Sequence, residues 1–142
     1  MALTISEALK DQVLDGILNA AAGINFDSGV LEIRTGAAPG ADAAAGGTLL
    51  ASMTLPADAF GAASGGSAAK AGTWQDATAD AAGTAQHFRI KQSGDSGGAT
   101  GSTDERIEGT VTATSGGGDI ELDNTSIAVG QQVTITSFSL SI

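Results

Sequence analysis

Alanine and glycine dominate this sequence and limit the hydrophobic core that it can build. They fill 27 and 21 of the 142 positions. The larger apolar residues (Val, Ile, Leu, Phe, Met and Trp) number 32, with one Trp and four Phe among them. That share lies just above the level at which chains are disordered. We therefore expect a single domain, residues 1–142, with a thin core.

The balance of charge excludes several classes of partner. Sixteen Asp and Glu residues stand against six Lys and Arg, which gives a formal charge of −10. Nucleic acid and anionic lipid are bound by clustered basic residues, so we expect neither as a partner. The chain has no Cys, which excludes disulfides and thiolate chemistry. With no membrane-spanning run and no basic signal segment, we expect a protein made in a reducing cytoplasm.

The first 23 residues have the pattern of an amphipathic helix. Apolar residues recur at spacings of three and four, namely Ile5, Leu9, Val13, Leu14, Ile17, Leu18 and Ala21. Thr4 and Glu7 have the spacing of a capping box, and Gly23 suits a C-cap. The pattern predicts a helix over about 5–21. Its apolar stripe either covers the sheet or contacts further copies, so the candidate interface residues here are Leu9, Val13, Leu14 and Ile17.

From residue 29 onward apolar and polar residues alternate, which is typical of β-strands. We predict strands over 30–34, 48–55, 84–92, 106–114, 120–122 and 132–142, and a weaker one over 68–74. Segments rich in Gly and Ala, at 36–47, 57–83 and 93–104, are predicted as loops that lie against another protein. The fold class predicted is mainly β, an antiparallel β-sandwich or small barrel with one N-terminal α-helix.

The last predicted strand changes its alternation part of the way along. Val133 and Ile135 lie on one parity, whereas the apolar residues after Ser137 lie on the other. A bulge near Ser137 would bring both sets to the same face, and we favour it. The alternative is that the second set contacts another subunit, which makes interface candidates of Phe138, Leu140 and Ile142.

A basic stripe occupies one face of the strand predicted over 84–92. His87, Arg89 and Lys91 alternate with Phe88 and Ile90. The favoured interpretation is cross-strand pairing within one chain, with Glu108 or Glu32 as the partner. The alternative is pairing with the acidic face of another subunit, so all three basic residues are interface candidates.

Acidic residues at 119, 121 and 123 are the weak candidates for a cation site. Asp119, Glu121 and Asp123 project from one face of a strand, and we expect 104–108 to be the partner segment of a hairpin. Adjacent carboxylates can bind calcium, but the chain has no EF-hand pattern. The favoured interpretation is a solvated acidic face, with no metal and no cofactor.

Catalytic signals are weak in this sequence. His87 is its one histidine, and no G-x-S-x-G motif accompanies it. Trp74 is the one candidate for stacking on a sugar, and we favour a buried anchor instead. We expect no catalytic residue and no enzymatic activity, and Trp74 is kept as an interface candidate.

Several segments resemble a group of small tailed-phage and prophage proteins. They are residues 1–9, 33–36, 47–51, 59–63, 83–89, 122–127 and 131–138, and the likeness covers nearly the whole chain. Proteins of this group are virion structural components or have no assigned role. The resemblance therefore implies a place in a phage particle and brings no catalytic residues.

These expectations combine into a function. We expect a capsid decoration or cement protein that binds the major capsid protein or another virion protein as a homo-oligomer. The alternative is a neck, tail or baseplate component, including a receptor-binding tip. A hydrolase or carbohydrate-binding module is a third hypothesis. In either virion role the protein would be assembled in the cytoplasm of a host bacterium.

Overall fold

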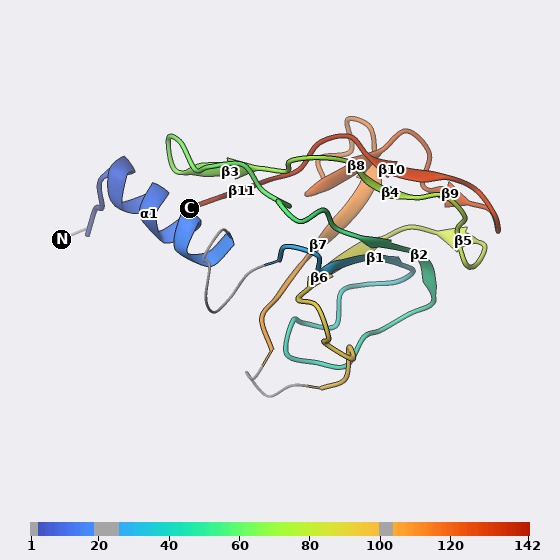
Figure 1. Cartoon of the computed structure of the whole chain (residues 1–142). Coiled ribbons are helices and arrows are strands. Elements are labelled where there is room, and N and C mark those ends of the chain that lie inside the picture. The colour runs from blue at the N-terminus through green and yellow to red at the C-terminus, as the bar shows by residue number, and fades with distance from the viewer. Residues whose placement is uncertain (1–2, 19–25, 100–103) are drawn as a thin grey trace.

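Five strands form the main sheet of the protein. The computed structural model describes residues 3–18, 26–99 and 104–142. The strand order is β2-β1-β6-β7-β8 (Figure 1). The bounds are β1 Val30–Arg34, β2 Leu49–Thr54, β6 His87–Lys91, β7 Arg106–Ala113 and β8 Ile120–Leu122. Neighbouring strands are antiparallel except for β7 and β8, which are parallel.

Three short strand pairs complete the β structure. They join β3 (Ser67–Ala69) to β11 (Ser139–Ser141), β4 (Trp74–Asp76) to β10 (Val133–Ile135), and β5 (Gly83–Thr84) to β9 (Ser126–Ile127). Together with the main sheet they curl into a half-barrel (Figure 1). The predicted class, a mainly β sandwich or small barrel with one helix near the N-terminus, is confirmed.

Aromatic rings fill the space between the main sheet and the short strand pairs. The ring centroid of Phe138 lies 5.5 Å from that of Phe88 on β6 and 5.8 Å from that of Trp74 on β4. Phe60 lies 5.3 Å from Trp74 in an edge-to-face arrangement. Such pairs contribute beyond the area that they bury. A few large rings thus give an alanine-rich chain a continuous core.

The final segment is two strands rather than one. β10 pairs with β4 and β11 pairs with β3, with residues 136–138 between them. Residues 70–73 interrupt the partner side, so the register shifts by one residue across the break. The predicted irregularity near Ser137 is present as this break, which turns Phe138 into the core with 7% exposure. The alternative, Phe138 in contact with another subunit, is therefore wrong.

Two other predictions need correction. Residues 57–83 are not one loop: they contain β3, β4 and β5, and the weak strand predicted over 68–74 is split between β3 and β4. The expected hairpin between β7 and β8 is a parallel pair. After β7 the chain runs back beside Thr110, where Asp119 accepts a hydrogen bond from the Thr110 amide, and only then turns into β8.

The helix α1 (Glu7–Leu18) begins two residues later than predicted. Ser6 caps it: the Leu9 amide donates to Ser6 Oγ at 3.3 Å, in place of the expected Thr4–Glu7 box. Ala21 and Gly23 lie outside the described residues. Within the described residues, no helix has the length and apolar character needed to cross a membrane.

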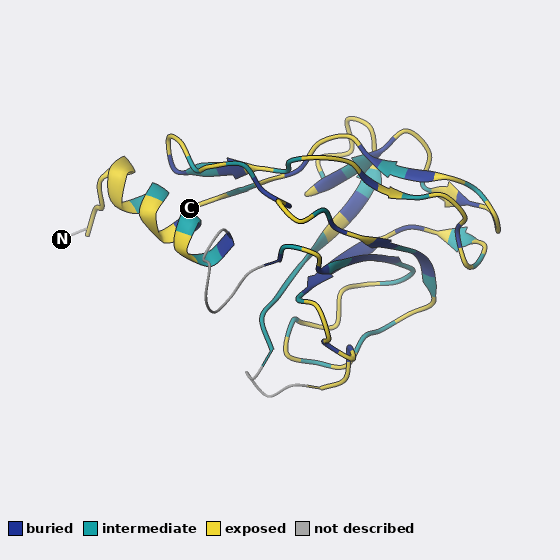
Figure 2. Ribbon diagram, viewed as in Figure 1, coloured by how far each residue is buried: buried dark blue, intermediate teal, exposed yellow. Residues whose placement is uncertain are grey.

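Only part of the predicted apolar stripe of α1 faces the core. Leu14 and Leu18 are fully buried, whereas Leu9 and Val13 are 46% and 40% exposed. Two carboxylates fix the helix beside the β3–β11 pair, because Asp11 accepts from the Gly66 amide and Asp15 from the Ala63 amide. Figure 2 shows the exposed residues along α1. One side of the helix is thus left uncovered.

We predict that Leu14→Ala and Val13→Ala separate the two sides of α1. Removing the Leu14 side chain leaves a cavity and should lower the free energy of unfolding by about 2–5 kcal/mol. The exposed Val13→Ala control should stay within about 0.5 kcal/mol of wild type. Urea denaturation measures both values, and equal effects would contradict the burial described here.

Candidate functional site

The two faces of the main sheet differ in chemistry. Side chains alternate along a strand, so Leu31 and Ile33 of β1 and Phe88 and Ile90 of β6 line the core. The opposite face holds charged and polar side chains and is called here the charged face. Its members are Glu32, Arg34, His87, Arg89, Lys91, Arg106 and Glu108. All five residues of β6 are buried, which means that this second face is also covered.

Strand register places opposite charges side by side on the charged face. Glu32 on β1 lies opposite Arg89 on β6, and Arg89 lies opposite Glu108 on β7. Acid, base and acid therefore form a row across three strands. Cross-strand neighbours of opposite charge stabilise a sheet. The sequence-based prediction that the basic stripe pairs within one chain is confirmed at these positions.

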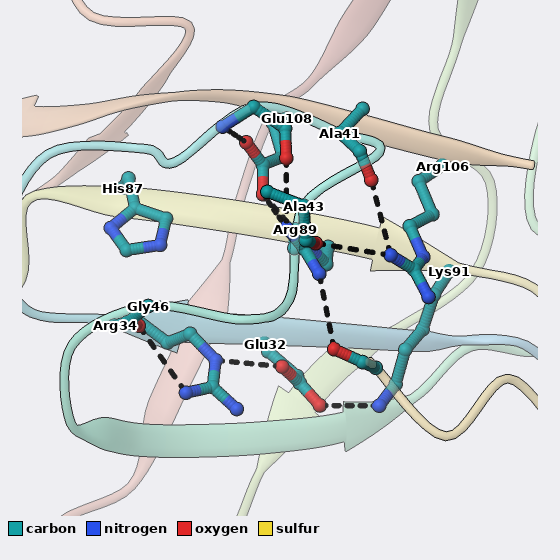
Figure 3. Close-up of polar contacts among 12 residues, drawn as sticks. Glu32, Arg34, Ala41, Ala43, Gly46, His87, Arg89, Lys91, Arg106 and Glu108 are labelled. Atoms are coloured by element: carbon teal, nitrogen blue, oxygen red, sulfur yellow. Dashed lines mark hydrogen bonds and ion pairs between the residues drawn. The ribbon is translucent and has the colours of Figure 1, made fainter. Parts of the chain in front are cut away.

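Ion pairs connect nearly every member of the charged face (Figure 3). Arg89 Nε donates to Glu108 Oε1 at 2.6 Å. Glu32 accepts from Arg34 Nε at 2.7 Å through one carboxylate oxygen and contacts Lys91 Nζ at 2.6 Å through the other. Arg89 is fully buried. A guanidinium removed from water is stable only with such partners.

The Gly/Ala-rich segment 36–47 folds over the charged face. Arg89 Nη2 donates to the Gly40 carbonyl at 3.1 Å, and the Gly40 amide donates to Glu108 at 2.9 Å. Arg106 Nη1 donates to the carbonyls of Ala41 and Ala43 at 3.1 and 3.2 Å. The segment is therefore fixed by its backbone, because alanine and glycine offer almost no side chain to pack. One side of segment 36–47 lies against its own sheet, and contact of its exposed side with another protein stays a prediction.

A tight closure joins the two ends of this covering segment. The Thr35 amide donates to the Thr48 carbonyl at 3.1 Å, and the Thr48 amide donates to Thr35 Oγ1 at 2.8 Å. Gly47 sits inside this closure with a φ of +65°, and a Cβ there would lie 1.9 Å from the Thr35 carbonyl oxygen. Only glycine fits such a position.

A second covering segment, 92–99, contributes its own carboxylate. Asp95 accepts from Arg106 Nε at 2.5 Å and from Nη2 at 2.6 Å, and the Gly97 amide also donates to it. The Arg106 hydrogen bond holds the pKa of Asp95 below its ordinary value, against the opposing effect of burial. The same bond raises the pKa of Arg106. A bidentate pair of this kind adds geometric specificity to the charge attraction.

Glu32 stays ionised although it is buried. Burial acts to raise the pKa of Glu32, but hydrogen bonds from Lys91 and Arg34, together with their charges, outweigh it. The net pKa of Glu32 therefore lies below its ordinary value. The carboxylate that joins two cations on β1 and β6 is thus present at neutral pH.

His87 is a structural contact for the covering segment. Its Nδ1 lies 2.7 Å from the Gly36 carbonyl oxygen and must donate, since a carbonyl only accepts. Within the described part of the chain, its Nε2 is buried and has no hydrogen-bond partner. The ring is 1% exposed. His87, Arg89 and Lys91 are all covered by the chain itself, so their assignment as interface residues is corrected.

Most of the basic residues of the protein lie on the charged face. Four of the six Lys and Arg residues belong to it, and four acids balance them: Glu32, Asp95, Asp104 and Glu108. Two basic and twelve acidic residues remain for the rest of the molecule. The entire formal charge of −10 therefore lies outside these eight paired residues.

The three weak metal candidates, Asp119, Glu121 and Asp123, accept hydrogen bonds around the turn between β7 and β8. Asp119 accepts from Thr110, Glu121 from the amides of Ser115 and Gly117 at 3.0 Å each, and Asp123 from Thr114 Oγ1 at 3.4 Å. In residues 3–18, 26–99 and 104–142, no three His, Asp or Glu side chains are grouped to hold a metal ion. Glu121 thus satisfies backbone donors of the glycine-rich turn, and Asp119 and Asp123 bond one threonine of β7 and one just after it.

The remaining interface candidates fall into two groups. Trp74 and Leu14 are fully buried, and Trp74 Nε1 donates to the Ala71 carbonyl at 3.1 Å, so neither forms a surface for a partner or a sugar. The predicted role of Trp74 as a buried anchor is confirmed. Leu9, Val13 and Ile142 are exposed. Ile17 and Leu140 are partly buried and line a hollow beside α1.

Three members of the charged network, Arg34, Asp95 and Arg106, were not named among the sequence-based candidates. Arg106 and Glu108 are two residues apart on the strand predicted over 106–114, so alternation already placed both on one face, as it did Arg34 and Glu32. Asp95 carried no such signal, because its segment has no periodicity. Its role depends on the contact of segment 92–99 with Arg106 at the start of β7.

We predict that Arg89→Met destabilises the protein more than removal of the whole pair does. Glu108 would stay buried without its partner, a cost of about 3–5 kcal/mol. The double variant Arg89→Met/Glu108→Leu should recover most of that loss. Lys70→Met is the control: the Lys70 side chain donates to the Gly72 carbonyl and lies over the Trp74 ring, a contact worth about 0.5–1 kcal/mol. Guanidinium denaturation measures all three variants. A double variant as unstable as Arg89→Met would contradict this account.

We also predict that stability falls as the pH drops below about 4. The pKa values of Glu32 and Asp95 are lower in the folded state than in the unfolded state. Their contribution is therefore complete above their ordinary pKa values of about 4 and is lost as the pH falls through the folded ones. Glu32→Gln should be less stable at pH 7 and show a shallower decline, whereas the exposed control Asp80→Asn should keep the wild-type slope. An unchanged slope in Glu32→Gln would refute the prediction.

Comparison with known proteins adds no relative. A scan against protein-family models and searches of curated proteins and of solved structures find no match to this chain. The resemblance to small tailed-phage proteins therefore stays a prediction from the sequence segments that carry it. Inference about function starts from the surfaces that the fold leaves exposed.

Proposed function

We propose that this protein is a non-enzymatic structural component of a tailed-phage particle, a capsid decoration protein that binds the outer lattice of the head. The observation that carries the proposal is the uncovered apolar side of α1. Leu9 and Val13 are 46% and 40% exposed and lie one turn apart on α1, and Ile5, just before the helix, is 44% exposed. An exposed apolar row on an otherwise acidic protein favours a partner protein that covers it.

The distribution of charge supports an outer position on the head. The charged face together with Asp95 and Asp104 is neutral, and twelve acids against two bases carry the net charge elsewhere. A surface of this sign is repelled by the phosphates of packaged DNA. The same surface suits a partner whose exposed residues are basic.

The hydrogen bonds that fix segment 36–47 to its own sheet suit a component of a particle. Segment 36–47 is fixed to the sheet by Arg89, Arg106 and Glu108, so the protein needs no partner to shape it. A protein that arrives with its loops already ordered loses less conformational entropy when it binds.

The proposal predicts a measurable effect on phage heads. Particles assembled without this chain should open at lower temperature, and antibody labels should mark the head of complete particles. Leu9→Ser/Val13→Ser should fold but leave the particles, whereas the control Val129→Ser, in the turn between β9 and β10 and 69% exposed, should remain bound. Electron microscopy and thermal release of DNA give the readouts.

Two results would overturn the assignment to the head. Unchanged head stability together with label confined to the tail would contradict it. A ring or spike of label at the end of the tail would instead identify a neck, tail or baseplate component. Cleavage of cell-wall polysaccharide by the purified chain would contradict the non-enzymatic part of the proposal.

A further inference from the structure

A hollow of about 360 Å³ lies where α1, the start of β7 and β11 meet. Its apolar lining comes from Ile17 of α1, Phe26, Ile107 of β7 and Leu140 of β11. Ile17, Ile107 and Leu140 are partly buried hydrophobic residues packed against the core. The hollow is therefore built on fixed elements of the fold, and its floor offers apolar contact to a ligand.

Carboxylates surround this apolar floor. Asp42 from segment 36–47 and Asp104 and Glu105 before β7 line the hollow together with Arg106. The Arg106 side chain is 1% exposed and is neutralised by Asp95 from beneath. Asp104 lies 3.5 Å from Arg106 Nη2 and is itself partly exposed. Because Asp95 and Asp104 both pair with Arg106, Asp42 and Glu105 are the two carboxylates left to favour a cation at the mouth.

The exposed row of α1 leads into the same hollow. Val13 and Ile17 are one helical turn apart, and Leu9 is one turn before Val13. Gly16 adjoins this row, and a Cβ built on Gly16 would meet nothing within 4 Å. Alanine would be more favourable there for an isolated helix. Contacts within the described part of the chain do not explain a glycine at that position, whereas a partner lying close to the helix would.

We propose that the hollow binds a lysine or arginine side chain of a different protein, with the apolar residues beside it lying along Leu9 and Val13. The alkyl stem of such a side chain matches the floor, and its charged end matches the carboxylates. The proposal deepens the function proposed above and rests on it for the existence of a partner protein.

A second copy of this chain is a poor source of that side chain. Four of its six basic residues lie in the charged network. Lys70 donates to the Gly72 carbonyl at 2.7 Å and lies over Trp74, and the Lys10 side chain packs beside Gly66. Twelve acids on each copy would also repel one another. Charge complementarity therefore favours a partner of basic character.

The test uses n-butylguanidinium as the probe and the full chain as the receptor. Titration followed by methyl and amide NMR should give saturable shifts at Ile17, Ile107 and Leu140. The uncharged n-butylurea should bind several-fold more weakly, because it matches the floor but not the carboxylates. The anion pentanoate should give no saturable shift. Absence of saturation with n-butylguanidinium, or equal binding of n-butylurea, would overturn the proposal.

Matched variants show whether the carboxylates of the hollow are responsible for binding n-butylguanidinium. Asp42→Asn/Glu105→Gln should weaken n-butylguanidinium binding by roughly twofold or more, because two favourable charge pairs are lost. The control Asp58→Asn/Asp80→Asn removes two exposed acids elsewhere and should leave binding unchanged. Equal weakening in both would mean that only the net charge matters, and the site would be refuted.

Two further results separate this inference from the proposed function. If the purified chain dimerises in sedimentation experiments and Asp42→Asn/Glu105→Gln abolishes the dimer, the occupant is a second copy and the proposal of a different protein is wrong. If n-butylguanidinium binds as expected but antibody against the chain never labels phage particles, the proposed virion function is wrong and the binding site stands. If label marks the head but the probe does not bind, the site is wrong and the function stands.

Discussion

Paired charges on the second face of the main sheet fix segment 36–47, which is rich in alanine and glycine and has few large side chains. Arg89 and Arg106 each bond a carboxylate and also carbonyls of segment 36–47. A loop of alanine and glycine buries little apolar area, so its backbone groups must find partners that the sheet supplies. Removing either partner of a buried pair costs more than the pair contributes, which ties the loop to the sheet cooperatively. The thin aromatic core on the other face therefore does not have to fix this loop.

The same pairing determines what the outside of the molecule presents. Because the charged face takes up four of the six basic residues, nearly every remaining charge is negative. Against this background the apolar row of α1 and the hollow beside it are the features that differ from the acidic surface. Structure and interaction surface are thus linked: the ion pairs that fix the Gly/Ala-rich segment leave two basic residues for the rest of the molecule.

Sequence patterns predicted the elements that depend on local periodicity and missed those that depend on distant contacts. The helix and the strands of the main sheet follow from spacings of 3.6 and 2 residues, and the parity of Arg89 and Glu108 placed both on one face. Segment 36–47 has no period, so nothing local showed that it folds back on its own sheet. The parallel pairing of β8 was hidden because a glycine-rich turn resembles a hairpin. The break at Ser137 was visible as a change of alternation, but its cause is pairing with two separate strands, β3 and β4.

Hydrogen exchange of the Gly40 amide tests the central claim most directly. This amide belongs to a glycine-rich loop and donates to the Glu108 carboxylate. If the charged face fixes the loop, Gly40 in the wild-type protein exchanges far more slowly than an unstructured glycine, with protection approaching that of the β6 amides. Exchange at nearly the unstructured rate, with β6 still protected, would show that the loop opens freely and that the paired charges do not hold it.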